Sequence, residues 1–259
     1  MTKDKHMSNR LLSVDILRGM TVAGMILVNN GYGDSFATLQ HSKWNGLTLC
    51  DLVFPFFLFI VGMSCFFSLK RFAFSVDKKI ILKIMKRTTI LFFIGLILNI
   101  LHNLLKENIL DFSQLRIWGV MQRIALCYLG VSLFAIFVNH RYTIPTVIAL
   151  LLSYTLLLYY GHGYSTNPDE NILSITDRAI FGDDHLYHKS PVDPEGLLGT
   201  ISCLAHTLLG FYCGQIVASQ EYIKKKIMNI VLLGATLTIV GFLLDGILPI
   251  NKRIWSPSY

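Results

Sequence analysis

The chain has 259 residues, of which 53% are hydrophobic and only 15% are charged, and its formal net charge is +7. Apolar stretches of about 20 residues recur along it, each long enough to cross a hydrocarbon core roughly 30 Å thick, which excludes an ordinary soluble domain. The basic balance does not indicate a nucleic-acid partner, because lysines and arginines gather at the ends of the apolar stretches and no nucleic-acid-binding motif is present.

Seven membrane spans are predicted, which makes the chain an all-α, polytopic transmembrane helix bundle that forms one domain over residues 1–259. The span centres lie near Ala23, Phe59, Gly95, Leu129, Leu151, Leu208 and Leu237. Basic residues follow spans two, four and six, whereas the loop after span one and the loop over residues 162–194 contain few. Because positive loops stay in the cytoplasm, the N-terminus is expected inside and the 162–194 loop on the extracytoplasmic side.

The first span follows basic residues, but Asp15 and Arg18 interrupt its apolar run and no small-residue cleavage site is evident. It is therefore interpreted as a retained helix rather than a signal peptide. Asp15 and Arg18 are three positions apart, which puts them on one helix face and close enough to pair. Arg18 has two open interpretations, an interfacial partner of Asp15 or a binding group for a ligand phosphate. Asn29 and Asn30 end the span at its outer face, where asparagines before glycines usually cap helices.

The second span is preceded by the stretch HSKWNGLT and begins close to Asp51. His41 is the only side chain in this stretch that exchanges a proton near neutral pH, although an ordinary surface histidine is the simpler interpretation. Its neighbours favour a site, because Asp51 can orient an imidazole, Asn45 can form hydrogen bonds, and Trp44 can stack on a sugar or adenine ring. A base with an orienting carboxylate is the arrangement found in activated nucleophiles and general bases.

The fourth span carries Gln122 and Arg123 within the stretch LRIWGVMQRIALCYLG. An unpaired arginine inside a span is costly, so Arg123 is expected to meet an anion. Asp15 and Asp51 are the candidate partners within the chain, and a phosphorylated ligand is the candidate outside it.

Metal binding is not predicted. The cysteines lie in or beside apolar segments and form no C-x-x-C pair, which is typical of small buried side chains rather than of a metal site or disulfide framework. They are Cys50, Cys65, Cys127, Cys203 and Cys213. Asp183, Asp184, His185 and His188 lie in a loop bounded by glycine and proline, where solvated turn residues are the better interpretation.

Six blocks of the chain resemble the heparan-alpha-glucosaminide N-acetyltransferase family of transmembrane acyltransferases, in the order that the family has them. The blocks are SVDILRGMTVAGMILVNN, HSKWNGLTLCDLVFPFFLFIVG, LRIWGVMQRIALCYLG, DRAIFGDDHLY, DPEGLLGT and INKRIWSPSY. The resemblance covers essentially the whole chain. It implies a membrane-embedded enzyme that moves an acetyl group from cytosolic acetyl-CoA to an amino sugar or glycan on the extracytoplasmic side.

The resemblance also implies roles for the residues of the outer site. The family's essential histidine lies in its H-x-x-W-N-G block, which corresponds here to His41. The family's asparagine at the outer end of the first span corresponds to Asn29 or Asn30, and that amide is a candidate for stabilising the oxyanion of acyl transfer. Asp51 is the expected orienting carboxylate.

Side-chain chemistry suggests which residues contact the sugar and which contact CoA. Trp44 and Asn45 are the candidates for holding the sugar. The CoA phosphates are expected to meet the cytoplasmic lysines together with Arg18, Gln122 and Arg123, because guanidinium groups match phosphate oxygens.

The extent of the chain leaves its activity open, because family members continue through further spans beyond the block matched by INKRIWSPSY. The chain is therefore expected to be truncated at its C-terminus. Two other classes remain, a transporter or channel with flux but no acyl product, and a non-catalytic membrane subunit that tolerates loss of His41. The expected partners are an amino sugar or glycan, the lipid bilayer and a second copy in a homodimer, and a bacterial inner (plasma) membrane is the expected location.

Overall fold

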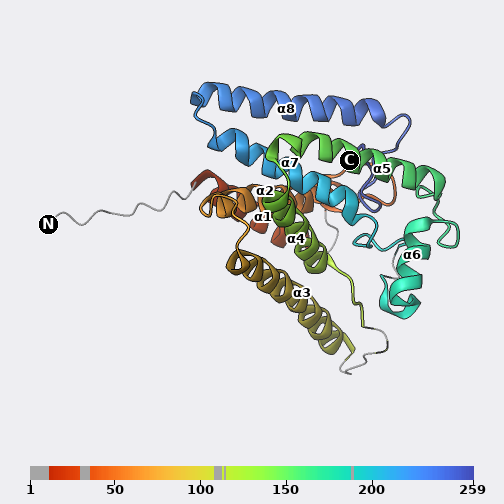
Figure 1. The fold of residues 1–259 in the computed structure, drawn as a ribbon. Helices are drawn as coiled ribbons and strands as arrows, with labels where there is room; N and C mark the ends of the chain where they lie inside the picture. The colour runs from red at the N-terminus through yellow and green to blue at the C-terminus, as the bar shows by residue number, and fades with distance from the viewer. Residues whose placement is uncertain (1–11, 30–35, 108–112, 114, 188–189) are drawn as a thin grey trace.

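The fold is all-α, as predicted. The computed structural model describes residues 12–29, 36–107, 113, 115–187 and 190–259, and within these ranges it contains α-helices and short 3-10 turns but no β-strand (Figure 1). The helices are α1 (Leu12–Asn29), α2 (Leu49–Lys70), α3 (Lys78–Glu107), α4 (Val120–Phe137), α5 (Thr143–Tyr160), α6 (Ile172–Phe181), α7 (Thr200–Ala218) and α8 (Ile223–Leu244). The 3-10 turns are η1 (Ala37–Leu39), η2 (His140–Tyr142) and η3 (Asp183–His185).

Seven of the helices in the described part of the chain are long and apolar enough to cross a membrane. They are α1 to α5, α7 and α8, and each predicted span centre lies inside one of them. The exception is α6, whose 10 residues are too few to cross and which belongs to the loop between α5 and α7. The prediction of seven spans is confirmed.

Helix α7 forms the centre of the bundle and contacts α2, α4, α5 and α8, with its most extensive contact to α2 (Figure 1). Helices α2 and α7 approach closely because a glycine on each helix lies directly against the backbone of the other. A Cβ on Gly62 would lie 1.9 Å from the carbonyl oxygen of Thr207, and one on Gly210 would lie 2.0 Å from that of Phe59. Small residues let membrane helices approach in this way, since burial of apolar surface gives no driving force between helices in lipid.

The outer helices expose their apolar side chains. None of the residues of α8 is buried, and its exposed side chains include Ile227, Val231 and Phe242. Helix α8 lies along the outside of the bundle and α3 diverges from it (Figure 1). In water such faces would aggregate, whereas hydrocarbon covers them at no cost, so these surfaces are those of an integral membrane protein.

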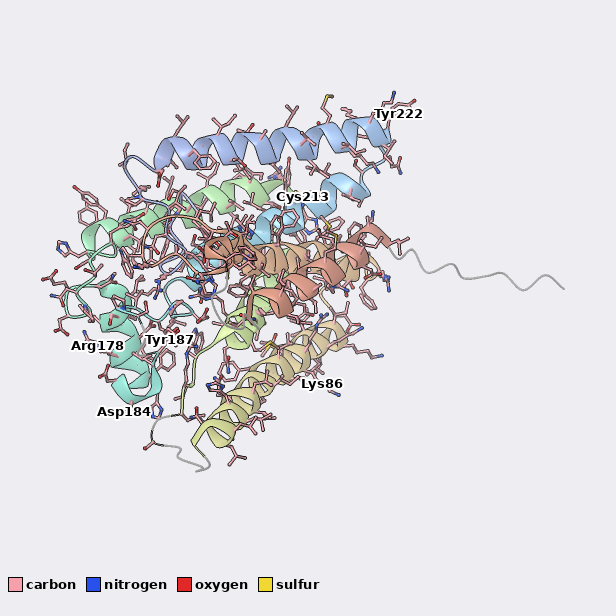
Figure 2. The ribbon with its side chains drawn as sticks, turned by 180° about the vertical axis from the view of Figure 1, so that it is seen from behind. Lys86, Arg178, Asp184, Tyr187, Cys213 and Tyr222 are labelled. Atoms are coloured by element: carbon pink, nitrogen blue, oxygen red, sulfur yellow. The ribbon has the colours of Figure 1, made fainter. Side chains whose placement is uncertain are left out.

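The connections gather at two ends of the bundle. We call the end that holds residues 36–48, 115–119, 161–187, 190–199 and 245–259 the His41 end, and the end that holds residues 70–79, 138–142 and 219–226 the basic end. Backbone hydrogen bonds tie distant parts of the His41 end together, from Gly46 to Ile250 (2.8 Å) and from Ile117 to His185 (3.3 Å). Arg178, Asp184 and Tyr187 lie toward one end, and Tyr222 lies at the other (Figure 2).

Candidate active site

A paired histidine and carboxylate form the centre of the candidate site at the His41 end. His41 Nδ1 lies 2.8 Å from Asp51 Oδ1, and the side chain of His41 is 50% exposed whereas that of Asp51 is fully buried. The imidazole is therefore half-exposed to solvent, and the buried Asp51 carboxylate contacts its Nδ1 edge. The two residues that the sequence placed in one site are in direct contact.

The local sequence explains why Asp51 is buried at this place. Asp51 is the third residue of α2, and its Oδ2 accepts hydrogen bonds from the backbone N–H (3.2 Å) and the hydroxyl (2.9 Å) of Thr48, the residue that caps the helix. Its Oδ2 also accepts from the backbone N–H of Ser42 (3.3 Å). A carboxylate in the first turn of a helix satisfies free N–H groups and complements the helix dipole, so Asp51 is fixed before it meets His41.

Lys252 completes the site and was missed by sequence reasoning. Its Nζ lies 3.0 Å from His41 Nδ1 and 3.5 Å from Asp51 Oδ1. Lys252 belongs to the stretch INKRIWSPSY, which carried a family resemblance but no assigned residue role. A sequence separation of 211 positions from His41 gives no periodicity or spacing from which the contact could be predicted.

Trp44 and Asn45, the candidate sugar contacts, have structural partners. Trp44 is half-buried and packs against the apolar cluster that includes Tyr154 and Ile254. The side-chain oxygen of Asn45 accepts a hydrogen bond from the amide of Asn251 (3.1 Å). Both residues therefore join the loop before α2 to the segment after α8, and their contacts with a sugar stay a prediction.

The asparagines at the end of α1 are placed only in part. Asn29 is the last residue of α1 and is exposed. Asn30 lies outside the described residues. A role for either amide toward an oxyanion therefore stays a prediction.

Arg18 lies in the half of α1 that is nearer the basic end. Its guanidinium donates to Asp15 Oδ1 (3.2 Å), which confirms the predicted pair, and to Ser64 Oγ on α2 (2.6 Å). The Arg18 side chain is partly exposed. It is therefore available to a ligand that approaches from the basic end.

Arg123 has different partners from those predicted. It lies in the first turn of α4 and is 1% exposed, and its guanidinium donates to the carbonyl oxygens of Pro194 (2.7 Å) and Gly196 (2.6 Å). The expectation that it pairs with Asp15 or Asp51 is wrong, because these two carbonyls, with the Trp255 ring 5.7 Å away, take up its charge. Its neighbour Gln122 is also buried and donates to the Phe92 carbonyl of α3 (3.4 Å). Contact of Arg123 or Gln122 with the CoA phosphates stays a prediction.

Residues 193–196 form a turn before α7, and Arg116 binds this turn together with Arg123. Arg116 is a second residue that sequence reasoning missed. Arg116 donates to both oxygens of Asp193 (2.5 and 3.2 Å) and to Glu195 Oε2 (2.7 Å). Burial lowers the pKa of Arg116, but the two carboxylates outweigh it and the net direction is upward. Arg123, in the first turn of α4, and Arg116, in the segment before it, therefore hold residues 193–196 in place before α7 begins.

Asp177 of α6 lies against the same turn. Its burial leads us to expect that the stability of the protein depends on pH. It is 1% exposed, its Oδ1 accepts from the backbone N–H of Leu197 (2.9 Å), and its Oδ2 has no hydrogen-bond partner. Burial and, to a smaller extent, Asp193 raise its pKa from 3.8 to about 6, although the Leu197 hydrogen bond and the Arg123 charge oppose the rise. The folded state thus holds the proton more tightly than the unfolded state, which favours folding at low pH.

This contribution is complete below about pH 4 and is lost as the pH rises to about 6 and beyond. Over that pH range the free energy of unfolding of the wild type should fall by about 3 kcal/mol, whereas that of Asp177→Asn should not. The variant is therefore expected to be the more stable protein above pH 6. Thermal unfolding in detergent between pH 4 and 7.5 measures the difference. Asp184→Asn, which removes an exposed carboxylate from the same loop, is the control, and parallel curves for wild type and Asp177→Asn would contradict the prediction.

The acidic loop next to α6 has another structural role. His185 Nδ1 lies 2.8 Å from the carbonyl oxygen of Leu115, which ties η3 to the chain before α4. His188 lies outside the described residues. Within the described ranges, no group of three or more histidine, cysteine or acidic side chains is arranged to hold a metal ion.

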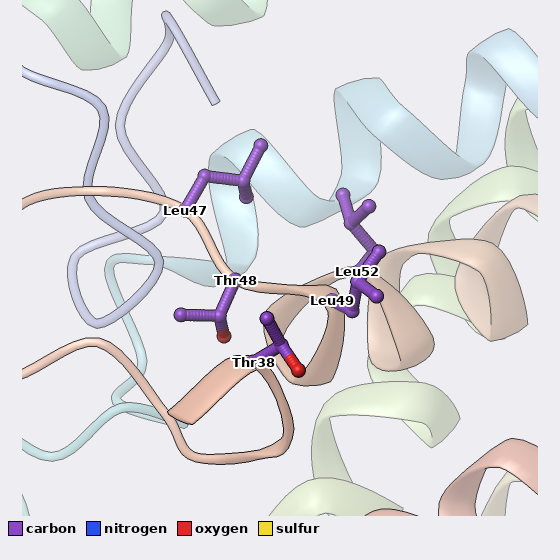
Figure 3. A pocket seen from close by; sticks show the side chains of 5 residues that line it. All are labelled: Thr38, Leu47, Thr48, Leu49 and Leu52. Carbon is purple, nitrogen blue, oxygen red and sulfur yellow. The ribbon is translucent and has the colours of Figure 1, made fainter. Parts of the chain in front are cut away.

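A small apolar pocket opens beside the start of α2 (Figure 3). Its volume is about 360 Å³, and Thr38, Leu47, Thr48, Leu49 and Leu52 line it. Thr48 belongs both to this lining and to the hydrogen bonds that hold Asp51. The pocket is therefore adjacent to the His41–Asp51 pair and suits an apolar group more than a sugar.

Comparison with known proteins gives a consistent result over almost the whole chain. Residues 10–184 match the family described as heparan-alpha-glucosaminide N-acetyltransferase, catalytic. The chain is 31% identical to the heparan-alpha-glucosaminide N-acetyltransferase of Mus musculus over 97% of its length, and 32% identical to that of Homo sapiens over 96%. These alignments cover 47% and 46% of the relatives, so the chain spans about half the length of the curated relatives that it matches.

Proposed function

Because the chain belongs to the heparan-alpha-glucosaminide N-acetyltransferase family, we propose that it is a membrane-embedded N-acetyltransferase. Its proposed acyl donor is acetyl-CoA, and its proposed acceptor is the amino group of an amino sugar or glycan. The proposal places the donor at the basic end, in the cytoplasm, and the acceptor at the His41 end.

The observation that carries the proposal is the His41–Asp51 pair. An imidazole that is half-exposed on one side and held by a buried carboxylate on the other has the arrangement of a general base or nucleophile. Because Nδ1 is within hydrogen-bond reach of the carboxylate, the proposal assigns the reactant to Nε2, which lies 3.5 Å from the Sγ atom of Cys50. The pair alone does not specify a reaction. We infer acetyl transfer because the chain belongs to a family of N-acetyltransferases.

Two routes of acetyl transfer fit this geometry. In the direct route, the sugar amine attacks the thioester carbonyl, its proton passes to His41 Nε2, the C–N bond forms, and the C–S bond breaks to release CoA. In the two-step route, Nε2 attacks first and releases the CoA thiolate, and the amine then takes the acetyl group from the imidazole. In both routes Asp51 stabilises the imidazole when it gains a proton or an acyl group.

The path of the donor follows from the two ends of the bundle. The basic end is rich in lysines that suit the phosphates of CoA, and Arg18 lies beyond them between α1 and α2. A pantetheine arm that passes along α2 from there would reach the apolar pocket and His41 at the start of the same helix. The positive charge of the basic end also supports a cytoplasmic position for it.

The test is acetyl transfer in membranes that contain the protein. Radiolabelled acetyl-CoA is supplied with a panel of amino sugars that includes glucosamine, and labelled N-acetyl product is expected for at least one acceptor. Sealed vesicles of each orientation then separate the donor side from the acceptor side. Movement of an unmodified sugar across the membrane with no labelled product would favour a transporter, and neither product nor flux would favour a non-catalytic subunit.

A further inference from the structure

The second turn of α2 contains a buried proline, Pro55. Proline has no backbone N–H, so the carbonyl oxygen of the residue four positions earlier does not receive the hydrogen bond that a helix normally gives it. That residue is Asp51, whose carboxylate contacts His41 (2.8 Å). The candidate site therefore includes a backbone carbonyl that α2 leaves without its usual N–H donor.

Tyr259 supplies a donor to this carbonyl. Its hydroxyl donates to the Asp51 carbonyl oxygen (2.5 Å), although the two residues are 208 positions apart in the sequence. The N–H of Tyr259 donates to the Ser256 carbonyl (2.9 Å), and its ring lies 5.4 Å from the ring of Trp255. These contacts hold the hydroxyl against the carbonyl that the N–H missing from Pro55 would have served.

Trp255 packs the segment after α8 against both central helices. It is 3% exposed, and its ring lies 5.3 Å from that of Phe54 on α2 and 6.2 Å from that of His206 on α7. His206 Nε2 lies 3.1 Å from the Pro55 carbonyl oxygen. The turn of α2 at Pro55 is therefore enclosed by α7 and by the segment after α8, so this segment has a fixed position on α2.

Asp51 is held at two places, its carboxylate and its carbonyl. Its Oδ2 accepts from Thr48 (3.2 and 2.9 Å) and Ser42 (3.3 Å), whereas its carbonyl accepts from Tyr259. The Asp51 side chain is fully buried, and a buried carbonyl without a donor is costly. Loss of the Tyr259 hydroxyl should therefore loosen the first turn of α2, and with it the contact between Asp51 and His41.

We propose that Tyr259 is a positioning residue of the acetyl-transfer site. Its hydroxyl takes the place of the N–H that Pro55 lacks and so holds Asp51 in contact with His41. This inference rests on the proposed function, because the orientation of the His41–Asp51 pair matters to the chemical step. Tyr259 acts through Asp51 and not on the donor, so its loss should lower kcat and leave the KM for acetyl-CoA unchanged.

The first test removes the hydroxyl and keeps the ring, in Tyr259→Phe. With radiolabelled acetyl-CoA and the preferred amino sugar, kcat should fall about tenfold, while the KM for acetyl-CoA stays within about twofold of the wild-type value. Tyr160→Phe, the same change at an exposed position at the end of α5, is the matched control and should keep both values. An unchanged kcat in Tyr259→Phe would overturn the proposal.

The proline provides a rescue experiment. Pro55→Ala gives the Asp51 carbonyl an N–H donor from within α2, so the Tyr259 hydroxyl becomes redundant. Adding Tyr259→Phe to Pro55→Ala should then lower kcat by less than about twofold, and the four proteins form a double-mutant cycle. Equal falls in kcat with and without the proline would show that the hydroxyl acts elsewhere, and the proposal would be wrong.

Cys50 reports the state of the first turn of α2 without relying on activity. It precedes Asp51, is 3% exposed, and lies together with Cys65 in residues 44–70, which trypsin releases as one peptide. N-ethylmaleimide is applied to the protein in membranes, and fragment ions of this peptide give the reaction rate at each cysteine. In Tyr259→Phe, Cys50 should react about tenfold faster, whereas Cys65, buried further along the same helix, should keep the wild-type rate.

The positioning role and the proposed function fail separately. If no acceptor is acetylated, faster labelling of Cys50 in Tyr259→Phe, and its reversal by Pro55→Ala, still measure the hold of Tyr259 on Asp51. If acetyl transfer occurs but Tyr259→Phe changes neither kcat nor the labelling of Cys50, the proposed function stands and the positioning role is wrong. Equal acceleration at Cys50 and Cys65 would show a general loosening of the protein and would also overturn the role.

Discussion

Replacement of His41 by alanine is expected to lower acetyl transfer by about 10²- to 10⁴-fold, the range that a positioned general base or nucleophile contributes. CoA binding should be unchanged, because the proposed phosphate contacts lie at the basic end and His41 lies at the start of α2. Initial rates with radiolabelled acetyl-CoA and the preferred amino sugar, together with calorimetric titration of CoA into the purified full-length protein, measure the two quantities.

The matched control is His102→Ala, which removes an exposed histidine on α3 and should transfer acetyl at the wild-type rate. Asp51→Asn should lie between the two, because the imidazole remains but loses the carboxylate that holds it at 2.8 Å. Turnover by His41→Ala equal to that of the wild type would remove the imidazole from the mechanism. Loss of CoA binding in the same variant would show that His41 contributes to the donor site instead.

The fold could be predicted from the sequence because its main determinant is local. A membrane span needs about 20 apolar residues in a row, and each of the seven predicted centres lies in a helix that satisfies this requirement. The contact of His41 with Asp51 was also within reach, since both belong to one short stretch in which Thr48 and Asp51 mark the start of α2. Composition, length and capping residues are properties of neighbouring positions.

The rest of the site depends on contacts that leave no trace in local sequence. Lys252 reaches His41 only because the segment after α8 returns to the start of α2, and Arg116 meets Asp193 across 77 positions. Arg123 was expected to pair with an acid, yet its partners are the carbonyl oxygens of Pro194 and Gly196. Every residue carries a carbonyl group, so the sequence cannot distinguish these two as the partners of a buried charge.

The second large effect is expected at the α2–α7 contact, where Gly62→Ala should destabilise the protein by about 3 kcal/mol. The added Cβ would lie 1.9 Å from the Thr207 carbonyl oxygen and 2.9 Å from the backbone nitrogen of Phe211. These neighbours are helix backbone and cannot rotate away as a side chain does, so the two central helices must separate, and overpacking of this kind typically costs 1–3 kcal/mol or more. For a chain of this size the melting temperature should fall by about 5–10 °C.

The protein carries its own probe for this measurement, because its five cysteines are all free and buried. A thiol-reactive fluorophore in detergent reports their exposure as the temperature rises. Gly234→Ala on α8 is the control, since a Cβ there meets nothing within 4 Å and alanine is the better helix former. Equal melting temperatures for the two variants would contradict the close approach of α2 and α7. Because α2 carries Asp51 at its start and α7 follows the turn held by Arg123, separation of these helices should also lower acetyl transfer at temperatures where Gly62→Ala remains folded.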